Sequence, residues 1–422
     1  MKVRRILSLG MTGLIALFVL AACAQSNPDT NTNQGTDTGS DTTEDAGSDA
    51  TSDATSDAGE DTAVEDVPVI PPPEFLGGDR PASYVLPNDY DPSVSMPLVL
   101  LLHGFTSSAS DQDLYFGLSL VTKTQGMMLV LPDGMKNPDG NQYWNATDAC
   151  CDFYQSGVDD VAYLSGVIEE AIEAFNIDTK RVFLVGHSNG GYMAHRLACE
   201  RSDLIAGIVS LAGSTWYDEA KCGNPDPVAV LQVHGTWDTT IRYWGVEQNI
   251  ADLSAPLLDV DACIADKCEE EQGNCTADPA CADLIVCFEE CEDSFNKDEC
   301  NGFCWNSAPQ GSRMRWMGAF VCALNGGCYD DPAVNRPGYP GAEEAVARWA
   351  AINGCLESVT EQESMDLLVE IPSADTVPLA HDNCPEGLQA TVWKIPGGGH
   401  VPNFNGNWSI QVVEWLKMQV KP

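Results

Sequence analysis

The chain of 422 residues is predicted to contain an α/β domain with a mostly parallel sheet flanked by helices. Two observations predict it: several short runs are apolar on both faces, as in strands buried within a parallel sheet, and stretches of helical periodicity separate them. Parallel strands that alternate with helices are joined by right-handed crossovers. The apolar runs occupy residues 97–104, 127–132, 181–186, 207–211, 228–235 and 390–395.

One predicted helix covers residues 158–175, where apolar side chains recur at helical spacing. Asp159 and Asp160 fall in its first turn, a position at which the helix dipole favours acidic side chains. Residues 190–199 and 343–351 show a similar pattern. These helices alternate with the predicted strands, as the layered fold requires.

The N-terminus is predicted to direct export. A basic region at residues 1–5 and an apolar run at residues 6–20 precede Leu-Ala-Ala-Cys, which resembles the lipobox of bacterial lipoproteins. The run is too short for a membrane-spanning helix and is typical of a signal peptide. We expect removal of residues 1–22 and acylation of Cys23, which then anchors the protein at the cell surface or in the periplasm unless it is released. The alternative is an ordinary signal peptide followed by an incidental cysteine.

Residues 23–75 are predicted to form an acidic, disordered linker. Ser, Thr, Asp, Ala, Gly and Asn dominate residues 24–67, which contain no Lys or Arg. Such a segment buries too little apolar surface to offset the entropy lost on ordering. It predicts a self-repelling tether between the anchor and the folded domain.

The charge balance excludes two classes of partner. With 63 acidic and 21 basic residues, the net charge is −42. No basic surface is available to neutralise nucleic-acid phosphates. The same shortage argues against electrostatic docking on anionic lipid, so we expect membrane contact through the lipid anchor only.

Residues 246–338 interrupt the strand–helix pattern and are predicted to be an inserted module rich in cysteine. Apart from Cys23, the chain has 16 cysteines, an even number that suits disulfides in an oxidising compartment. Because residues four apart share one helix face, two antiparallel helices would pair Cys287 with Cys304 and Cys291 with Cys300. A structural zinc site is the alternative, but the insert has no His. The remaining pairings in the insert stay open, for Cys263, Cys268, Cys275, Cys281, Cys322 and Cys328.

Outside the insert, we favour the pairs Cys199–Cys222 and Cys355–Cys384. Cys150 and Cys151 then form a vicinal pair or bond elsewhere. The insert itself is interpreted as a lid, a polymer-binding patch or a surface decoration, and the sequence does not decide among them. Its acidic residues lack the ligand spacing of a calcium loop, so no metal is predicted.

The motif Gly-His-Ser-Asn-Gly at residues 186–190 follows a predicted strand and opens a predicted helix. This context is typical of a nucleophile elbow, in which a tight turn exposes the serine hydroxyl. Small neighbours are needed at such a turn, and glycine stands on both sides. Ser188 is therefore the predicted nucleophile; the alternative is a glycine-rich turn without chemistry.

A serine nucleophile needs a histidine base and an acid that orients it. Asp238 and His400 each follow a predicted strand, and the order Ser188, Asp238, His400 is the one that this fold requires. His381 is the rival base. His103 is expected to shape the oxyanion loop and Asp133 to be a turn residue, while structural roles are expected for His187, His195 and His234.

Two backbone N–H groups should stabilise the oxyanion. Asn189 follows the nucleophile at a helix N-terminus, where negative charge is favoured. The second donor should come from the loop after the strand at residues 97–102. We choose Phe105 and keep Thr106 as the neighbouring alternative.

Several motifs resemble extracellular polyhydroxybutyrate depolymerases and the related feruloyl and acetyl-xylan esterases of the α/β-hydrolase superfamily. The resemblance covers roughly residues 81–245 and 339–417 and implies a catalytic domain at residues 76–245 and 339–422. It also implies a secreted carboxylic ester hydrolase with a Ser-His-Asp triad and no cofactor. By position, the triad is again Ser188, Asp238 and His400. The motifs lie at residues 101–105, 143–145, 150–151, 158–161, 186–190, 234–238 and 397–400.

The sequence therefore predicts ester hydrolysis through an acyl-enzyme. The expected substrate is polymeric: a polyhydroxyalkanoate, or feruloyl and acetyl esters of plant polysaccharide. Two alternatives remain, a peptidase or acyltransferase on the same fold and a non-catalytic surface-binding protein.

Overall fold

The computed structural model describes residues 71–248, 260–291, 307–325, 337–369 and 373–422, together with Cys304 and Cys328. The predicted signal peptide, Cys23 and nearly all of the linker lie outside the described residues. Among the helices that are described, none combines the length and apolar character needed to cross a bilayer.

A nine-stranded sheet forms the centre of the domain, in the order β1-β3-β2-β6-β7-β8-β13-β12-β11. The neighbours from β3 to β13 all pair in parallel. These parallel strands are β2 (Met96–Leu102), β3 (Met128–Leu131), β6 (Ile177–His187), β7 (Gly207–Leu211), β8 (Ala229–Gly235) and β13 (Ala390–Ile395). The predicted fold class, a mostly parallel sheet of the α/β type, is confirmed, and each of the six apolar runs overlaps one of these strands.

Three strands at the sheet edges pair antiparallel and were not predicted from the sequence. They are β1 (Ser83–Val85), β12 (Val377–His381) and β11 (Val359–Glu361). Most of their side chains are partly or fully exposed, so they lack the continuous apolar run that marks a central strand. Two short antiparallel pairs form separate two-stranded sheets: β4 (Met135–Lys136) with β5 (Gln142–Tyr143), and β9 (Gly245–Val246) with β10 (Tyr339–Pro340).

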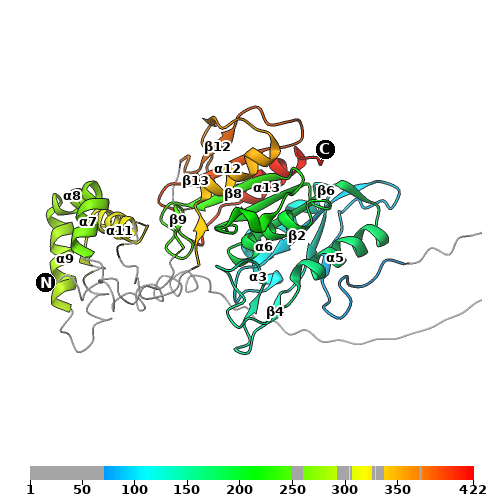
Figure 1. Cartoon of the computed structure of the whole chain (residues 1–422), viewed down its shortest axis with the longest axis horizontal. Helices are drawn as coiled ribbons and strands as arrows, with labels where there is room; N and C mark the ends of the chain where they lie inside the picture. The colour runs from blue at the N-terminus through cyan, green and yellow to red at the C-terminus, as the bar shows by residue number, and fades with distance from the viewer. Residues whose placement is uncertain are drawn as a thin grey trace, which may run out of the picture. The chain divides into compact units, whose positions relative to one another are not determined.

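The sheet separates two hydrophobic cores. Along β2, Leu98 and Leu100 face one core while Val99 and Leu101 face the other, as the two-residue period of a strand requires. Helices α5 (Asp160–Ala174), α6 (Asn189–Glu200) and α12 (Ala342–Asn353) contribute to the first core. Helices α3 (Ala109–Phe116), α4 (Leu118–Thr122) and α13 (Asn407–Lys417) contribute to the second. Helices thus cover both faces of the sheet (Figure 1).

The insert begins and ends at one place in the domain, because β9 and β10 pair antiparallel with Gly245 opposite Pro340. Between them the described chain forms α7 (Val260–Lys267), α8 (Glu269–Thr276), α9 (Pro279–Cys291) and α11 (Gln310–Asn325). Its described disulfides are Cys263–Cys328, Cys268–Cys322, Cys275–Cys281 and Cys287–Cys304. The favoured pair Cys287–Cys304 is therefore present, whereas the pair Cys291–Cys300 lies outside the described residues.

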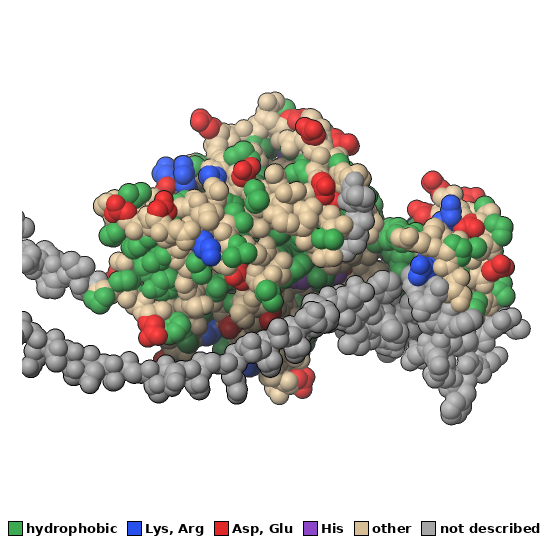
Figure 2. Space-filling model, turned by 180° about the vertical axis from the view of Figure 1, so that it is seen from behind, with side chains coloured by type: hydrophobic (Ala, Val, Ile, Leu, Met, Phe, Trp, Pro, Cys, Tyr) green, Lys and Arg blue, Asp and Glu red, His purple; other side chains and the backbone are tan. Residues whose placement is uncertain are grey.

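Three more disulfides lie in the α/β domain: Cys150–Cys151, Cys199–Cys222 and Cys355–Cys384. The vicinal alternative for Cys150 and Cys151 is thus the one that the structure adopts. On the face that Figure 2 shows, the few Lys and Arg side chains of the described residues lie among acidic and uncharged ones.

Candidate active site

Ser188 lies in the tight turn between β6 and α6, with a backbone φ of 53°. Left-handed φ is unfavourable for a residue with a side chain and is typical of a nucleophile elbow. The flanking glycines are required by close backbone contacts. A Cβ on Gly186 would lie 2.2 Å from the carbonyl oxygen of Gly190, and a Cβ on Gly190 would lie 2.1 Å from that of Leu102.

The structure brings together the three residues predicted to form the triad. His400 Nε2 lies 2.9 Å from Ser188 Oγ, and His400 Nδ1 lies 2.7 Å from Asp238 Oδ2. Asp238 follows β8 and His400 follows β13, two strands that pair in parallel. Their carboxyl ends therefore reach the same edge of the sheet, where open α/β sheets gather their sites.

Asp238 is fully buried, and its carboxylate is held from several sides. Oδ1 accepts hydrogen bonds from the backbone N–H groups of Thr240 and Ile241, at 2.8 and 2.9 Å. Burial alone would raise the pKa of Asp238, but His400 and the hydrogen bonds from His234 and His400 outweigh it, so the pKa lies well below its usual value. The carboxylate consequently stays ionised at neutral pH.

The rival base His381 is not part of this arrangement. It ends the antiparallel strand β12, and its Nδ1 hydrogen-bonds to the carbonyl of Leu356 at 2.9 Å. Asp133 accepts a hydrogen bond from the N–H of Ala109 at 2.7 Å, in keeping with a turn residue. Neither side chain is hydrogen-bonded to Ser188.

Two of the predicted structural histidines, His187 and His195, are buried and neutral. Burial, and to a smaller extent the charge interaction with His400, lowers the pKa of His187 to about 3. Burial lowers the pKa of His195 to about 4. His187 Nε2 lies 3.1 Å from the carbonyl of His400, and so helps to hold the base. His195 lies between Gln232 and the indole N–H of Trp349.

His234 supports the acid loop rather than serving as the base. Its Nε2 lies 2.8 Å from the carbonyl of Ile241 and 3.3 Å from Asp238 Oδ2. His103 is fully buried, and burial lowers its pKa. Its Nε2 accepts the N–H of Gly134 and its Nδ1–H donates to the carbonyl of Gly104, so it fixes the loop that leads to Phe105.

The two oxyanion candidates can be compared directly. The N–H of Thr106 donates to the carbonyl of Gln142 at 2.9 Å, so it is already occupied. Among the described residues, the N–H of Phe105 donates to no acceptor, and Asn189 opens α6. The geometry therefore favours Phe105 over Thr106 as the partner of Asn189.

Asp160 differs from its expected role in the first helical turn. Asp159 is the helix cap, whose side chain accepts the N–H of Ala162. Asp160 is fully buried, forms an ion pair with Arg80 at 2.8 Å and accepts the N–H of Asn145 at 2.7 Å. Sequence reasoning missed this contact because an acid in a first turn already had an explanation.

A pocket of about 650 Å³ lies beside the segment of residues 145–157. Its lining includes the Cys150–Cys151 disulfide, Phe153, Arg196 and Trp216. The ring of Phe153 meets the ring of Phe105 edge-on at 5.6 Å, which links the pocket wall to the candidate oxyanion loop. No residue group among the described parts of the chain has the make-up of a metal site.

Comparison with known proteins gives a consistent result. A family model described as Phospholipase/Carboxylesterase matches residues 92–255. NocK of Nocardia uniformis subsp. tsuyamanensis, whose name assigns it to the esterases, is 31% identical over 38% of this chain and 45% of its own length. Feruloyl esterase B of Piromyces equi is 28% identical over 38% of this chain and 29% of its own length. The chain thus spans less than half the length of either relative.

Among solved structures, an acetyl xylan esterase from Aspergillus awamori aligns with 80% of this chain and 94% of its own, at 11% identity and a TM-score of 0.44. The sheet order and the elbow show an α/β-hydrolase fold, and the sequence matches show that this chain is similar to proteins named esterases.

Proposed function

We propose that the protein is a serine carboxylic ester hydrolase that works through an acyl-enzyme. The observation that carries the proposal is the hydrogen-bonded series Asp238–His400–Ser188, with distances of 2.7 and 2.9 Å at the end of a nucleophile elbow. A serine, an imidazole and a buried carboxylate in this order can activate a hydroxyl at neutral pH. The esterase relatives support the same reaction class.

In the proposed mechanism, His400 Nδ1–H donates to Asp238, which leaves Nε2 free to accept the Ser188 proton. Attack of Ser188 Oγ on the ester carbonyl transfers this proton to His400, and the imidazolium then protonates the departing alcohol. Water, deprotonated by the same imidazole, cleaves the acyl-enzyme and releases the acid. Asp238 remains ionised throughout and stabilises the cation.

Negative charge on the carbonyl oxygen is stabilised by the N–H groups of Phe105 and Asn189. Each such donor contributes about 3 kcal/mol to the transition state in enzymes of known mechanism. The N-terminus of α6 adds a favourable dipole at the same place.

The proposed substrates are esters attached to a polymer. The names of two relatives, a feruloyl esterase and a bifunctional acetylxylan esterase/xylanase, favour feruloyl or acetyl esters of plant polysaccharide. A polyhydroxyalkanoate is the second candidate, suggested by the motif resemblance. Release of ferulate, acetate or hydroxybutyrate from feruloylated arabinoxylan, acetyl-xylan and polyhydroxybutyrate film by the purified protein would distinguish them.

We also propose export and anchoring through Cys23, with residues 23–75 as a linker and residues 246–338 as a separate module. The seven described disulfides support an oxidising compartment. Metabolic labelling with palmitate should mark the full-length protein but not its Cys23→Ser variant. Equal labelling of both would remove the anchor from the proposal.

The experiment that tests the activity is hydrolysis of nitrophenyl acetate by the wild type and by Ser188→Ala. We expect the variant to lose at least about 10³-fold in kcat, as when a triad member is removed. Equal rates in the two proteins would contradict the proposal. A parallel assay on nitroanilide and acyl-acceptor substrates would reveal a peptidase or acyltransferase, and inactivity on every substrate would point to a binding protein.

A further inference from the structure

We infer that Trp144 is a positioning residue that joins the two halves of the oxyanion site, an inference that rests on the proposed ester hydrolysis. The two candidate donors come from different loops: Phe105 follows β2 and Asn189 follows β6. The sheet pairs these strands only as far as Leu102 and Gly186. Beyond this point the loops are held by other contacts, which include the close packing of Gly190 against the carbonyls of Leu102 and His103.

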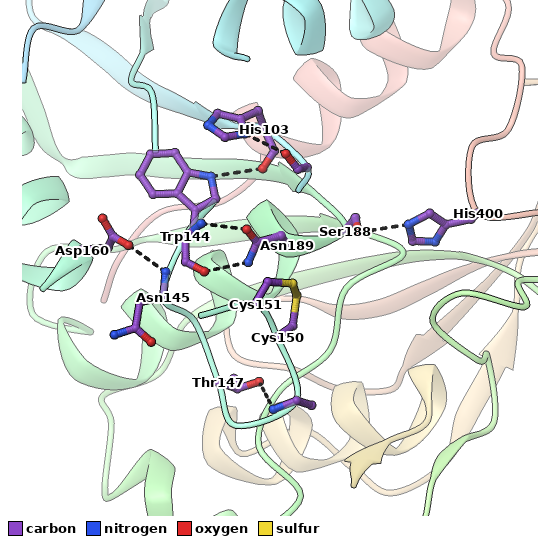
Figure 3. The surroundings of a disulfide bond; sticks show 12 residues. His103, Trp144, Asn145, Thr147, Cys150, Cys151, Asp160, Ser188, Asn189 and His400 are labelled. Atoms are coloured by element: carbon purple, nitrogen blue, oxygen red, sulfur yellow. Dashed lines mark hydrogen bonds between the residues drawn. A yellow bond between two sulfur atoms is a disulfide. The ribbon is translucent and has the colours of Figure 1, made fainter. Parts of the chain in front are cut away.

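Trp144 makes that contact in both directions. Its backbone N–H donates to Asn189 Oδ1 at 2.7 Å, and its carbonyl accepts from Asn189 Nδ2 at 2.9 Å. Its indole N–H donates to the carbonyl of His103 at 3.0 Å. One residue is therefore bonded to the loop of each donor, and Figure 3 shows its ring directed toward His103 and its backbone toward Asn189.

The bonds are made in the interior of the protein. Trp144, Asn189 and His103 are all fully buried. Their hydrogen bonds are consequently protected from water. A buried acceptor that loses its donor there destabilises the local structure, because water cannot replace the lost hydrogen bond. A change at Trp144 should therefore move the loops rather than be absorbed by solvent.

Trp144 is itself held in place by a second set of contacts. The peptide that supplies its carbonyl to Asn189 also supplies the N–H of Asn145 to Asp160, at 2.7 Å. Asp160 is paired with Arg80, and Arg196 Nη1 donates to the carbonyl of Asn145 at 2.6 Å. The position of this peptide is thus determined from both ends.

His103 extends the connection to Phe105. Its Nδ1–H donates to the carbonyl of Gly104, which belongs to the same peptide as the N–H of Phe105. In a trans peptide, the carbonyl and the N–H point in opposite directions. Holding the carbonyl at His103 therefore fixes the direction of the Phe105 N–H, and the indole bond of Trp144 fixes the backbone of His103.

The test replaces Trp144 by Phe, which keeps an apolar ring but removes the indole N–H. Trp408→Phe is the matched control: Trp408 is also buried, lies in the other core, and has an indole N–H without a partner among the described residues. For nitrophenyl acetate, we expect Trp144→Phe to lower kcat about tenfold or more while KM changes less than about twofold, because the contact matters mainly in the transition state. Trp408→Phe should stay within about twofold of the wild type in both constants.

A trifluoromethyl ketone provides a second readout, because its adduct with serine places an oxyanion in the site. Its Ki should rise in Trp144→Phe by about the factor lost in kcat/KM and stay unchanged in Trp408→Phe. Equal kcat and Ki in the two variants, with both proteins folded by circular dichroism, would overturn the inference.

Asn189→Ala keeps the backbone N–H but removes both bonds to Trp144, and it decides the matter if Trp144→Phe does not fold. A tenfold loss in kcat with a matching rise in Ki supports the role of Trp144, and wild-type values exclude it. If the wild type hydrolyses no ester, the proposed function fails. The role of Trp144 is then judged by the rate at which a fluorophosphonate labels Ser188 in the same variants.

Discussion

At the residue scale, Asp238 shows how a carboxylate is kept ionised inside a protein. Two backbone N–H groups bind one oxygen, and His400 binds the other at 2.7 Å. The lowered pKa means that Asp238 loses its charge only in strongly acidic solution. The acid is thus available to orient the base across the whole pH range in which an esterase would work.

Asp238→Asn should leave the fold intact and lower kcat by about 10³- to 10⁴-fold, because the amide no longer stabilises the imidazolium and favours the wrong tautomer. Asp133→Asn is the control, since Asn can still accept the N–H of Ala109. Rates on nitrophenyl acetate measure the effect. A loss of less than tenfold in Asp238→Asn would show that this carboxylate is not the partner of the base.

The residues predicted to carry the chemistry could be found from sequence because each follows a strand of clear apolar character. Trp144 was visible only as part of a family motif, and Asp160 was interpreted only as an acid in the first turn of a helix. The partner of Asp160 is Arg80, eighty residues earlier in the chain. Such a contact depends on how distant parts of the chain pack together, and no local sequence pattern predicts it.

At the element scale, the elbow between β6 and α6 determines what the neighbouring residues can be. Gly190 packs against the end of β2 so closely that a Cβ would lie 2.1 Å from one carbonyl oxygen and 2.7 Å from another. Either the end of β2 or the start of α6 must move to admit a methyl group. This close approach, rather than flexibility, explains the glycine.

Gly190→Ala should therefore lower Tm strongly or prevent folding, whereas Gly166→Ala in α5 should be tolerated. A Cβ at Gly166 meets nothing within 4 Å, and alanine is favoured over glycine in a helix by about 1 kcal/mol. Thermal unfolding followed by circular dichroism compares the two. Similar Tm values for both variants would contradict the close packing of the elbow.

Elements were predictable to the extent that they were buried on both faces. The six central strands are largely continuous apolar runs, whereas all three residues of β11 are exposed and the strand was not predicted. In the insert, the spacing of the cysteines predicted a helix carrying Cys287 and its bond to Cys304. The other three described pairings link positions whose separation depends on the packing of several helices, which spacing alone does not give.

At the scale of the whole molecule, buried histidines make stability depend on pH. The pKa of His195 is lowered to about 4 in the folded protein, while the unfolded chain has the ordinary value near 6.5. Below pH 6.5, His195 takes up a proton in the unfolded chain but stays neutral in the folded protein. The free energy of unfolding therefore falls as the pH drops from 6.5 toward 4. From this shift, the loss at pH 4.5 is on the order of 2–3 kcal/mol.

His195→Gln should consequently show a smaller drop in Tm between pH 7.5 and pH 4.5 than the wild type, although it is less stable at pH 7.5. Comparing two proteins of nearly equal charge removes the general effect of titrating the many acidic side chains. Differential scanning calorimetry at both pH values gives the result. An equal drop in both proteins would show that His195 is not kept neutral by burial.

The central claim is that Ser188 becomes nucleophilic through His400. Peptide mapping by mass spectrometry after treatment with a fluorophosphonate tests it most directly. We predict one adduct, on Ser188, which is absent in Ser188→Ala and forms at least about 100-fold more slowly in His400→Ala. An adduct on another residue, or labelling of Ser188 at the same rate without His400, would contradict the account.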